Sequence, residues 1–246
     1  MNELVWSTST DALAMLNVLF PLRGFDSGEP QSRKSRWYLL ACARQRWEQL
    51  PGVCRAVVSF AEQIYGSRTT NKLLRERVYP HAESLYHSCG EVGEMNELGQ
   101  TLVQLGLAKP ADVQVEVDTD PEILAGLAYL AYSPFSRTVP IFRQIPDEFH
   151  SADLIREIFG PRESVRLEPM WLTDNVCHMA AEAESDLSLL PILADALQDA
   201  GCDRQDLLTH LRHPGPHLRW CWALALVLGD NDEPNRPAHP GRSLPE

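Results

Sequence analysis

The chain has 246 residues, of which 44% are hydrophobic and 23% charged, and this is enough apolar material for one large globular domain or two smaller ones. No apolar run approaches the roughly 18 residues that a membrane-spanning helix needs, and the first residues lack the basic segment of a secretory signal. These features argue against a membrane protein and favour a cytoplasmic one, whose six scattered cysteines we expect to be reduced.

Charge is distributed unevenly along the chain. Residues 1–110 hold 12 Lys/Arg and 11 Asp/Glu, a balance of +1, whereas residues 111–246 hold 10 and 23, a balance of −13. Within the first part, residues 33–77 hold ten basic residues and three acidic ones. This local excess of positive charge can attract an acidic partner.

Apolar residues recur at three- and four-residue steps along most of the chain, and strict alternation is rare. The pattern predicts an all-α fold, an irregular multi-helix bundle, either as one body or as two helical subdomains packed on each other. The expected helices cover residues 11–20, 33–50, 53–65, 70–86, 94–107, 123–132, 152–159, 171–183, 187–200, 203–211 and 216–228.

Composition divides the chain into four parts. Residues 1–110 form an N-terminal helical part with a basic helix, and residues 111–150 combine an apolar helix with a proline-rich connector. Alternating valines at 113–117 fit a linker or a short edge strand. Residues 151–229 form a C-terminal helical part, which we expect to pack on the first part. Residues 230–246 are polar and proline-rich and should be disordered.

Four C-terminal segments occur in a recognisable order: LIREIFG at 154–160, EPMWLTD at 168–174, LPILADALQDAGC at 190–202 and HLRHPGPHLRWCW at 210–222. In this order they resemble a group of uncharacterised bacterial proteins that are abundant as paralogues in planctomycetes. The group has no established activity, so the resemblance implies a common fold and no particular function.

The richest set of side chains that could bind a metal lies near the C-terminus: Cys202, His210, His213, His217 and Cys221. Thiolate and imidazole are typical zinc ligands. Cys202 is separated from His210 by about 12 Å along a helix, so we assign this thiol to the core. His217 and Cys221 form an i, i+4 pair in the expected last helix, and the Pro-Gly-Pro turn before them can fold His210 or His213 back toward this pair.

Two interpretations of this region remain open. The favoured one is a packed helical corner without a cofactor, in which His217 donates to a helix end and Cys221 lies in the core. The alternative is a structural zinc site formed by His210, His213, His217 and Cys221, and a zinc-dependent hydrolase at residues 210–221 is a further alternative.

The basic helix that begins at residue 33 supplies the candidate binding residues, because aromatic planes interleaved with Arg can stack on and pair with nucleic acid. These residues are Arg33, Lys34, Arg36, Trp37, Arg44, Arg46 and Trp47. The favoured interpretation is internal: the indoles pack within the bundle, and the arginines balance the acidic C-terminal part.

No nucleophile or acid/base pair can be identified, so no catalytic residue is assigned. We therefore expect a non-enzymatic helical protein-interaction or adaptor module whose protein partner is unidentified. The alternatives are a nucleic-acid-binding protein that uses residues 33–77 and the zinc-dependent hydrolase.

Overall fold

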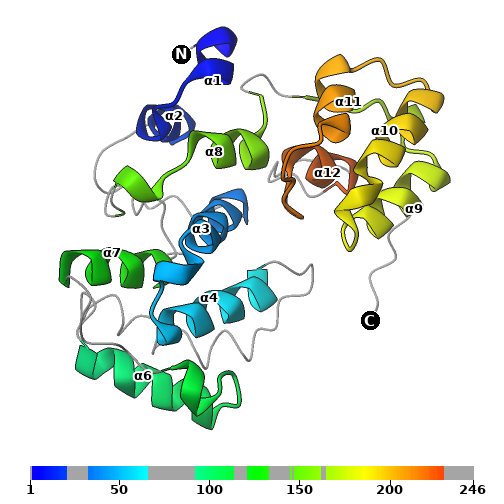
Figure 1. Ribbon diagram of the computed structural model, residues 1–246. Helices are drawn as coiled ribbons and strands as arrows, with labels where there is room; N and C mark the ends of the chain where they lie inside the picture. The colour runs from blue at the N-terminus through cyan, green and yellow to red at the C-terminus, as the bar shows by residue number, and fades with distance from the viewer. Residues whose placement is uncertain are drawn as a thin grey trace. The chain divides into compact units, whose positions relative to one another are not determined.

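The computed structural model describes residues 2–20, 33–65, 92–113, 121–132, 145, 147–161 and 165–229. Every regular element in these ranges is an α-helix or a short 3₁₀ turn, which confirms the predicted all-α class (Figure 1). The chain divides into two compact units, Glu3–Ile155 and Arg156–Glu246. None of the helices in the described ranges combines the length and hydropathy of a membrane span.

The first unit contains six complete helices in its described part, and α8 begins in it. Its elements in chain order are α1 (Glu3–Thr8), α2 (Ala12–Leu19), α3 (Arg33–Gln45), the 3₁₀ turn Trp47–Gln49, α4 (Gly52–Tyr65), α6 (Val92–Gln104), the 3₁₀ turn Pro110–Asp112, α7 (Pro121–Tyr132), the 3₁₀ turn Asp147–Phe149 and α8 (Ala152–Phe159), which continues into the second unit.

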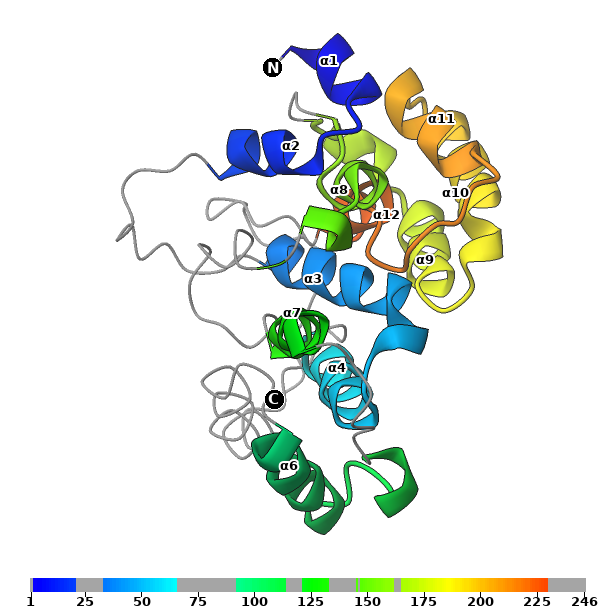
Figure 2. The ribbon, with the colours of Figure 1, turned by 60° about the vertical axis from the view of Figure 1, so that its left-hand side comes forward.

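The core of the first unit lies where α3, α4 and α7 pack side by side (Figures 1 and 2). An unbroken run of α3, from Trp37 to Ala43, is buried. The indole of Trp37 donates to the carbonyl of Tyr65 at 3.1 Å, which links α3 to the end of α4. A second link uses the buried hydroxyl of Tyr38, which lies 3.0 Å from Nδ1 of His150. This helix is therefore a central element of its unit.

The second unit continues from α8 through a series of short helices. They are the 3₁₀ turn Pro169–Trp171, α9 (Asp174–Ala183), the 3₁₀ turn Leu187–Leu189, α10 (Leu190–Asp199), α11 (Gln205–Arg212) and α12 (Trp222–Val227). In this unit α10 packs between α9 and α11, and α12 contacts both of them (Figure 1). Leucines of α10, α11 and α12 form its core, together with Val176, Ala180 and Ala183 of α9 and with Cys202, Cys221 and Trp222.

Local capping accounts for several helix ends that the sequence predicts. Asp11 caps α2 by accepting the amide proton of Ala14 at 2.8 Å. Gly201 follows α10 with a φ of +92°, a conformation that favours glycine. The amides of Gly201 and Cys202 then return to the last carbonyls of α10, at Gln198 and Leu197, which closes the helix.

Two predicted helices differ most from the structure. The helix expected over 33–50 ends at Gln45, and the chain then forms the 3₁₀ turn Trp47–Gln49. Pro51 disfavours the α conformation in the residue before it, and Leu50 is extended. The helix expected over 216–228 begins only at Trp222. Residues 213–220 instead form a loop. In this loop the amide of Leu218 donates to the side chain of Glu157, and the imidazole of His217 lies against the carbonyl of His213.

Several other expectations lie outside the described residues. They are the helix over 70–86, most of the alternating valine segment, nearly all of the connector before residue 147, and the tail 230–246. The packing of the first and last helical parts on each other stays a prediction.

Gly160 follows α8 with a φ of +79°, and a Cβ atom there would lie 2.7 Å from the indole of Trp222. We expect Gly160→Ala to lower the free energy of unfolding by about 3 kcal/mol, through the left-handed backbone and the clash together. Gly229→Ala is the matched control, since its φ is +74° and no heavy atom of the described residues lies within 4 Å of a Cβ built there. It should cost about 1 kcal/mol in urea unfolding. Equal losses for the two variants would contradict the packing of Trp222 on Gly160.

Candidate functional site

Four polar side chains of the second unit converge on one point, and we call them the corner cluster: Glu157, His210, His217 and Cys221. Their potential ligand atoms all lie within 4.8 Å of one another. The carboxylate comes from α8 and the first imidazole from α11. The other two side chains come from the loop that leads into α12, with Cys221 at the N-cap position of that helix. Segments distant in sequence therefore meet at this corner.

The carboxylate of Glu157 holds the loop between α11 and α12. Its Oε1 atom lies 3.2 Å from Nδ1 of His217 and accepts the amide proton of Leu218 at 3.0 Å. The other ring nitrogen of His217, Nε2, lies 2.9 Å from the carbonyl of His213. Both imidazole nitrogens of His217 thus face oxygen acceptors, and this arrangement favours the ring with a proton on each nitrogen.

His210 and Cys221 line the inner side of the cluster. Nε2 of His210 is buried and makes no hydrogen bond within the described residues, and it lies 3.6 Å from the second carboxylate oxygen of Glu157. Its ring contacts the edge of the His217 ring and the indole of Trp222, at centroid distances of 4.9 and 5.1 Å. The fully buried Sγ of Cys221 accepts the amide proton of Leu224 at 3.4 Å. The thiol is therefore both an N-cap and part of the cluster.

The two histidines have opposite electrostatic environments. The hydrogen bond to Glu157 raises the pKa of His217 above its ordinary value, while partial burial acts against it. Burial lowers the pKa of His210 to about 4, although Glu157 pulls that pKa upward. Burial raises the pKa of Cys221 to about 12. Burial thus favours the neutral forms of the His210 imidazole and the Cys221 thiol, whereas the contact with Glu157 favours the protonated form of His217.

Three of the four candidate metal ligands, His210, His217 and Cys221, belong to the cluster, and His213 does not. The exposed ring of His213 accepts the amide proton of Gly215 through Nδ1 at 3.0 Å, and only its backbone carbonyl reaches His217. Sequence analysis missed Glu157, because its role depends on a tertiary contact across some 60 residues. Cys202 lies in the core, as expected.

The candidate binding residues of the basic helix contact other parts of the first unit. The guanidinium groups of Arg33, Arg36 and Arg44 lie over the rings of Trp37, Tyr65 and Trp47, respectively, at 3.8–4.9 Å from the ring centres. Lys34 is half-buried.

Arg44 and Arg46 make polar contacts as well. Arg44 also pairs with Glu62, its Nε lying 2.7 Å from the carboxylate, and Arg46 donates to the carbonyl of Glu148 and lies over Phe149. These contacts lie within the first unit, and the expected balance of the arginines against the acidic C-terminal part stays a prediction.

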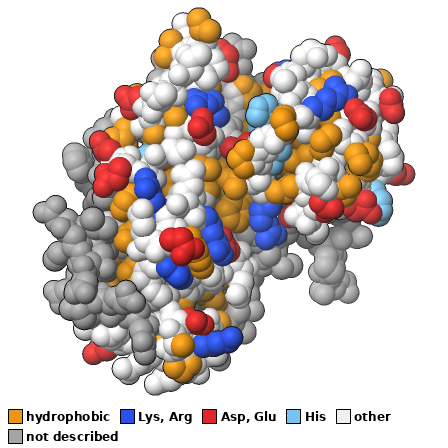
Figure 3. Space-filling view, viewed as in Figure 1, with side chains coloured by type: hydrophobic (Ala, Val, Ile, Leu, Met, Phe, Trp, Pro, Cys, Tyr) orange, Lys and Arg blue, Asp and Glu red, His pale blue; other side chains and the backbone are white. Residues whose placement is uncertain are grey.

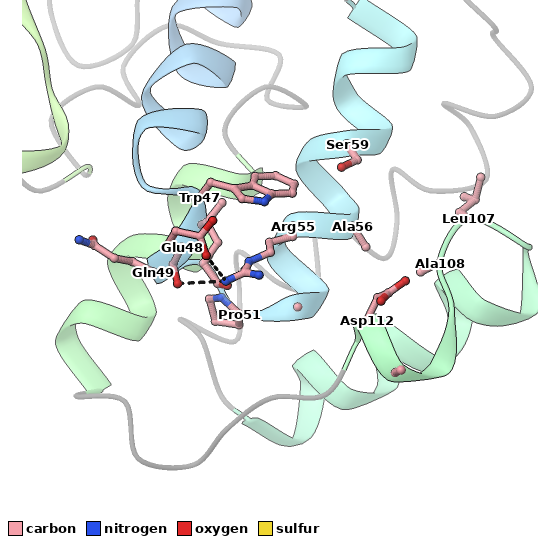
Figure 4. A pocket seen from close by; sticks show the side chains of 13 residues that line it. Trp47, Glu48, Gln49, Pro51, Arg55, Ala56, Ser59, Leu107, Ala108 and Asp112 are labelled. Atoms are coloured by element: carbon pink, nitrogen blue, oxygen red, sulfur yellow. Dashed lines mark hydrogen bonds and ion pairs between the residues drawn. The ribbon is translucent and has the colours of Figure 1, made fainter.

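A groove of about 680 Å³ also lies in the first unit, between the turn at residues 47–50, the first half of α4 and the segment 107–112 (Figure 4). Arg55 projects into it and donates to the carbonyls of Leu50 and Glu48, at 2.9 and 3.0 Å. The main cationic group of the groove is therefore already bonded to the unit's own backbone.

Comparisons of this chain with protein-family models, with curated proteins and with solved structures find no match. Function is therefore argued from the chain's own side chains.

The ion pair in the corner cluster should contribute more to stability than an exposed pair of the same type. Glu157 and His217 have side chains only 15% and 9% exposed, whereas Glu182 and His178 on α9 are 54% and 77% exposed. We expect Glu157→Gln to lower the free energy of unfolding by about 2 kcal/mol, and Glu182→Gln by less than about 0.5 kcal/mol. Urea unfolding of the full chain measures both. Similar losses would show that the corner does not depend on this carboxylate.

Proposed function

We propose that the protein is a non-enzymatic helical module that binds a partner protein through the acidic surface of its second unit. The observation that carries the proposal is the charge of residues 165–212, which contain nine Asp/Glu and three Arg, a balance of −6. Acidic side chains are spread over this part of the molecule (Figure 3). Such a surface attracts a partner with a basic surface and speeds their encounter.

The acidic surface keeps charge that its own arginines do not neutralise. Arg204 pairs with Asp206 and Arg212 with Asp195, both at 2.6 Å. Other exposed acidic residues have no ion pair within the described part of the chain, among them Glu168, Asp199 and Asp203. These side chains can contact a cationic partner without first breaking an internal pair.

Three described thiols support a role without covalent catalysis. Cys42, Cys54 and Cys221 are buried, and burial raises the pKa of each thiol to about 12. A protonated, buried thiol is a poor nucleophile at neutral pH. The nucleic-acid alternative is weakened in turn. Arg33 and Arg36 of α3 lie over aromatic rings, and Arg44 pairs with Glu62. Arg46, just after α3, donates to a backbone carbonyl of the same unit.

The test compares two sets of charge-removing substitutions in the tagged full chain, used to capture partners from the native host. Replacing Glu168, Asp199 and Asp203 by their amides should reduce recovery of a specific protein partner about tenfold, because the attraction is electrostatic. Raising the salt concentration to about 0.5 M should release that partner from the unchanged chain.

The matched control carries the same number of amide substitutions at exposed acids of the first unit, Glu48, Glu97 and Asp147. It should recover the partner as well as the unchanged chain does. Equal recovery by both variants would contradict the proposal, as would recovery of nucleic acid that is lost in a variant with Arg33 and Arg36 replaced.

A further inference from the structure

The corner cluster combines the geometry and the chemistry of a metal site, and we propose that it binds one Zn²⁺ ion through Glu157, His210, His217 and Cys221. This inference is independent of the acidic surface. It starts from the convergence of one carboxylate oxygen, two imidazole nitrogens and one sulfur within 4.8 Å of one another.

The spacing of these atoms is close to that of a tetrahedral site. Zinc bonds of about 2.0–2.3 Å place neighbouring ligand atoms about 3.3–3.8 Å apart. One ligand spacing already has this size, His210 Nε2 to Oε2 of Glu157 at 3.6 Å, and His217 Nδ1 lies 3.2 Å from the other oxygen of the same carboxylate, Oε1. Shifts of about 1 Å, within reach of side-chain rotation, bring the remaining ligand pairs to the same spacing.

The groups around the cluster orient its members toward a common centre. Nε2 of His217 faces the carbonyl of His213, which leaves Nδ1 directed at the cluster. Metal-binding histidines characteristically donate their second ring nitrogen to a carbonyl or carboxylate in this way. The amide of Leu218 likewise bonds to Oε1 of Glu157, so Oε2 remains available as a ligand. Nε2 of His210 is buried beside Glu157 and, within the described residues, has no hydrogen-bond partner that a metal bond would have to replace.

The donor set selects the class of metal. One sulfur, two nitrogens and one oxygen suit Zn²⁺, whereas Mg²⁺ and Ca²⁺ take oxygen ligands. The side chains of the four residues are at most 19% exposed. Four protein ligands in a closed corner leave no position for a reacting water, which makes the site structural and argues against the zinc-dependent hydrolase.

The site would join three segments of the second unit that the backbone does not hold together locally. Glu157 belongs to α8, His210 to α11, and the other two ligands flank the non-helical residues that precede α12. Because the ligands converge only in the folded unit, bound zinc should stabilise that unit.

The experiment titrates the purified full chain, freed of metal with EDTA, first with Co²⁺ and then with Zn²⁺. We expect one equivalent of Co²⁺ to produce tetrahedral visible bands and a thiolate-to-cobalt charge-transfer band, and Zn²⁺ to abolish both. Zinc should also raise the melting temperature of the chain. X-ray absorption of the zinc-loaded chain should show one sulfur in the coordination shell, which tests the ligand set without any substitution.

Cys221→Ser should remove the charge-transfer band and weaken zinc binding by at least about 100-fold, with circular dichroism confirming that the variant is folded. His213→Ala is the matched control, because its ring lies outside the cluster while its backbone carbonyl is retained. Cys177→Ser, a half-buried thiol elsewhere in the unit, is the sulfur control. Both controls should bind zinc like the unchanged chain.

Three results would overturn the proposal. They are a folded chain that takes up no stoichiometric zinc or cobalt at micromolar concentrations, a coordination shell without sulfur, and unchanged binding in folded Cys221→Ser.

Discussion

The largely buried carboxylate of Glu157 is the constraint on which the corner of the second unit depends. A buried carboxylate is stable only where donors or opposite charge surround it. Glu157 meets this requirement with the imidazole of His217 and the amide of Leu218, both from a loop some 60 residues later in the chain. These bonds hold the loop in place ahead of α12, which begins after Cys221.

The corner cluster also bears on the proposed binding of a partner protein. A metal ion at the corner and the ion pair between Glu157 and His217 are two ways of holding the same segments together. Either would fix α11 against the start of α12, and α11 packs on α10. In the proposed function, the acidic side chains of these helices would then stand on a rigid support, so that less order would have to be gained when a partner binds.

Local signals in the sequence predict much of the second unit. The helix over 152–159 has the predicted bounds, and Gly201 ends α10 because a glycine adopts the left-handed backbone that the closing hydrogen bonds need. Pro216, by contrast, resembles the first residue of a helix, yet tertiary hydrogen bonds hold the following residues in a loop.

The site is only partly predictable for the same physical reason. His210, His217 and Cys221 lie close together in sequence, so spacing identifies them. His213 shares that spacing, but its ring turns to the amide of Gly215. Glu157 looks like any polar residue at the edge of an amphipathic helix, and only the packing of α8 in the second unit gives it its role.

Anomalous diffraction at the zinc absorption edge, from crystals grown with zinc, tests the central claim most directly. The account expects a single strong peak at about 2.0–2.3 Å from Glu157, His210 Nε2, His217 Nδ1 and Cys221 Sγ. A well-ordered corner with no peak, in which His217 bonds directly to Glu157 while zinc is present in the crystal, would contradict it.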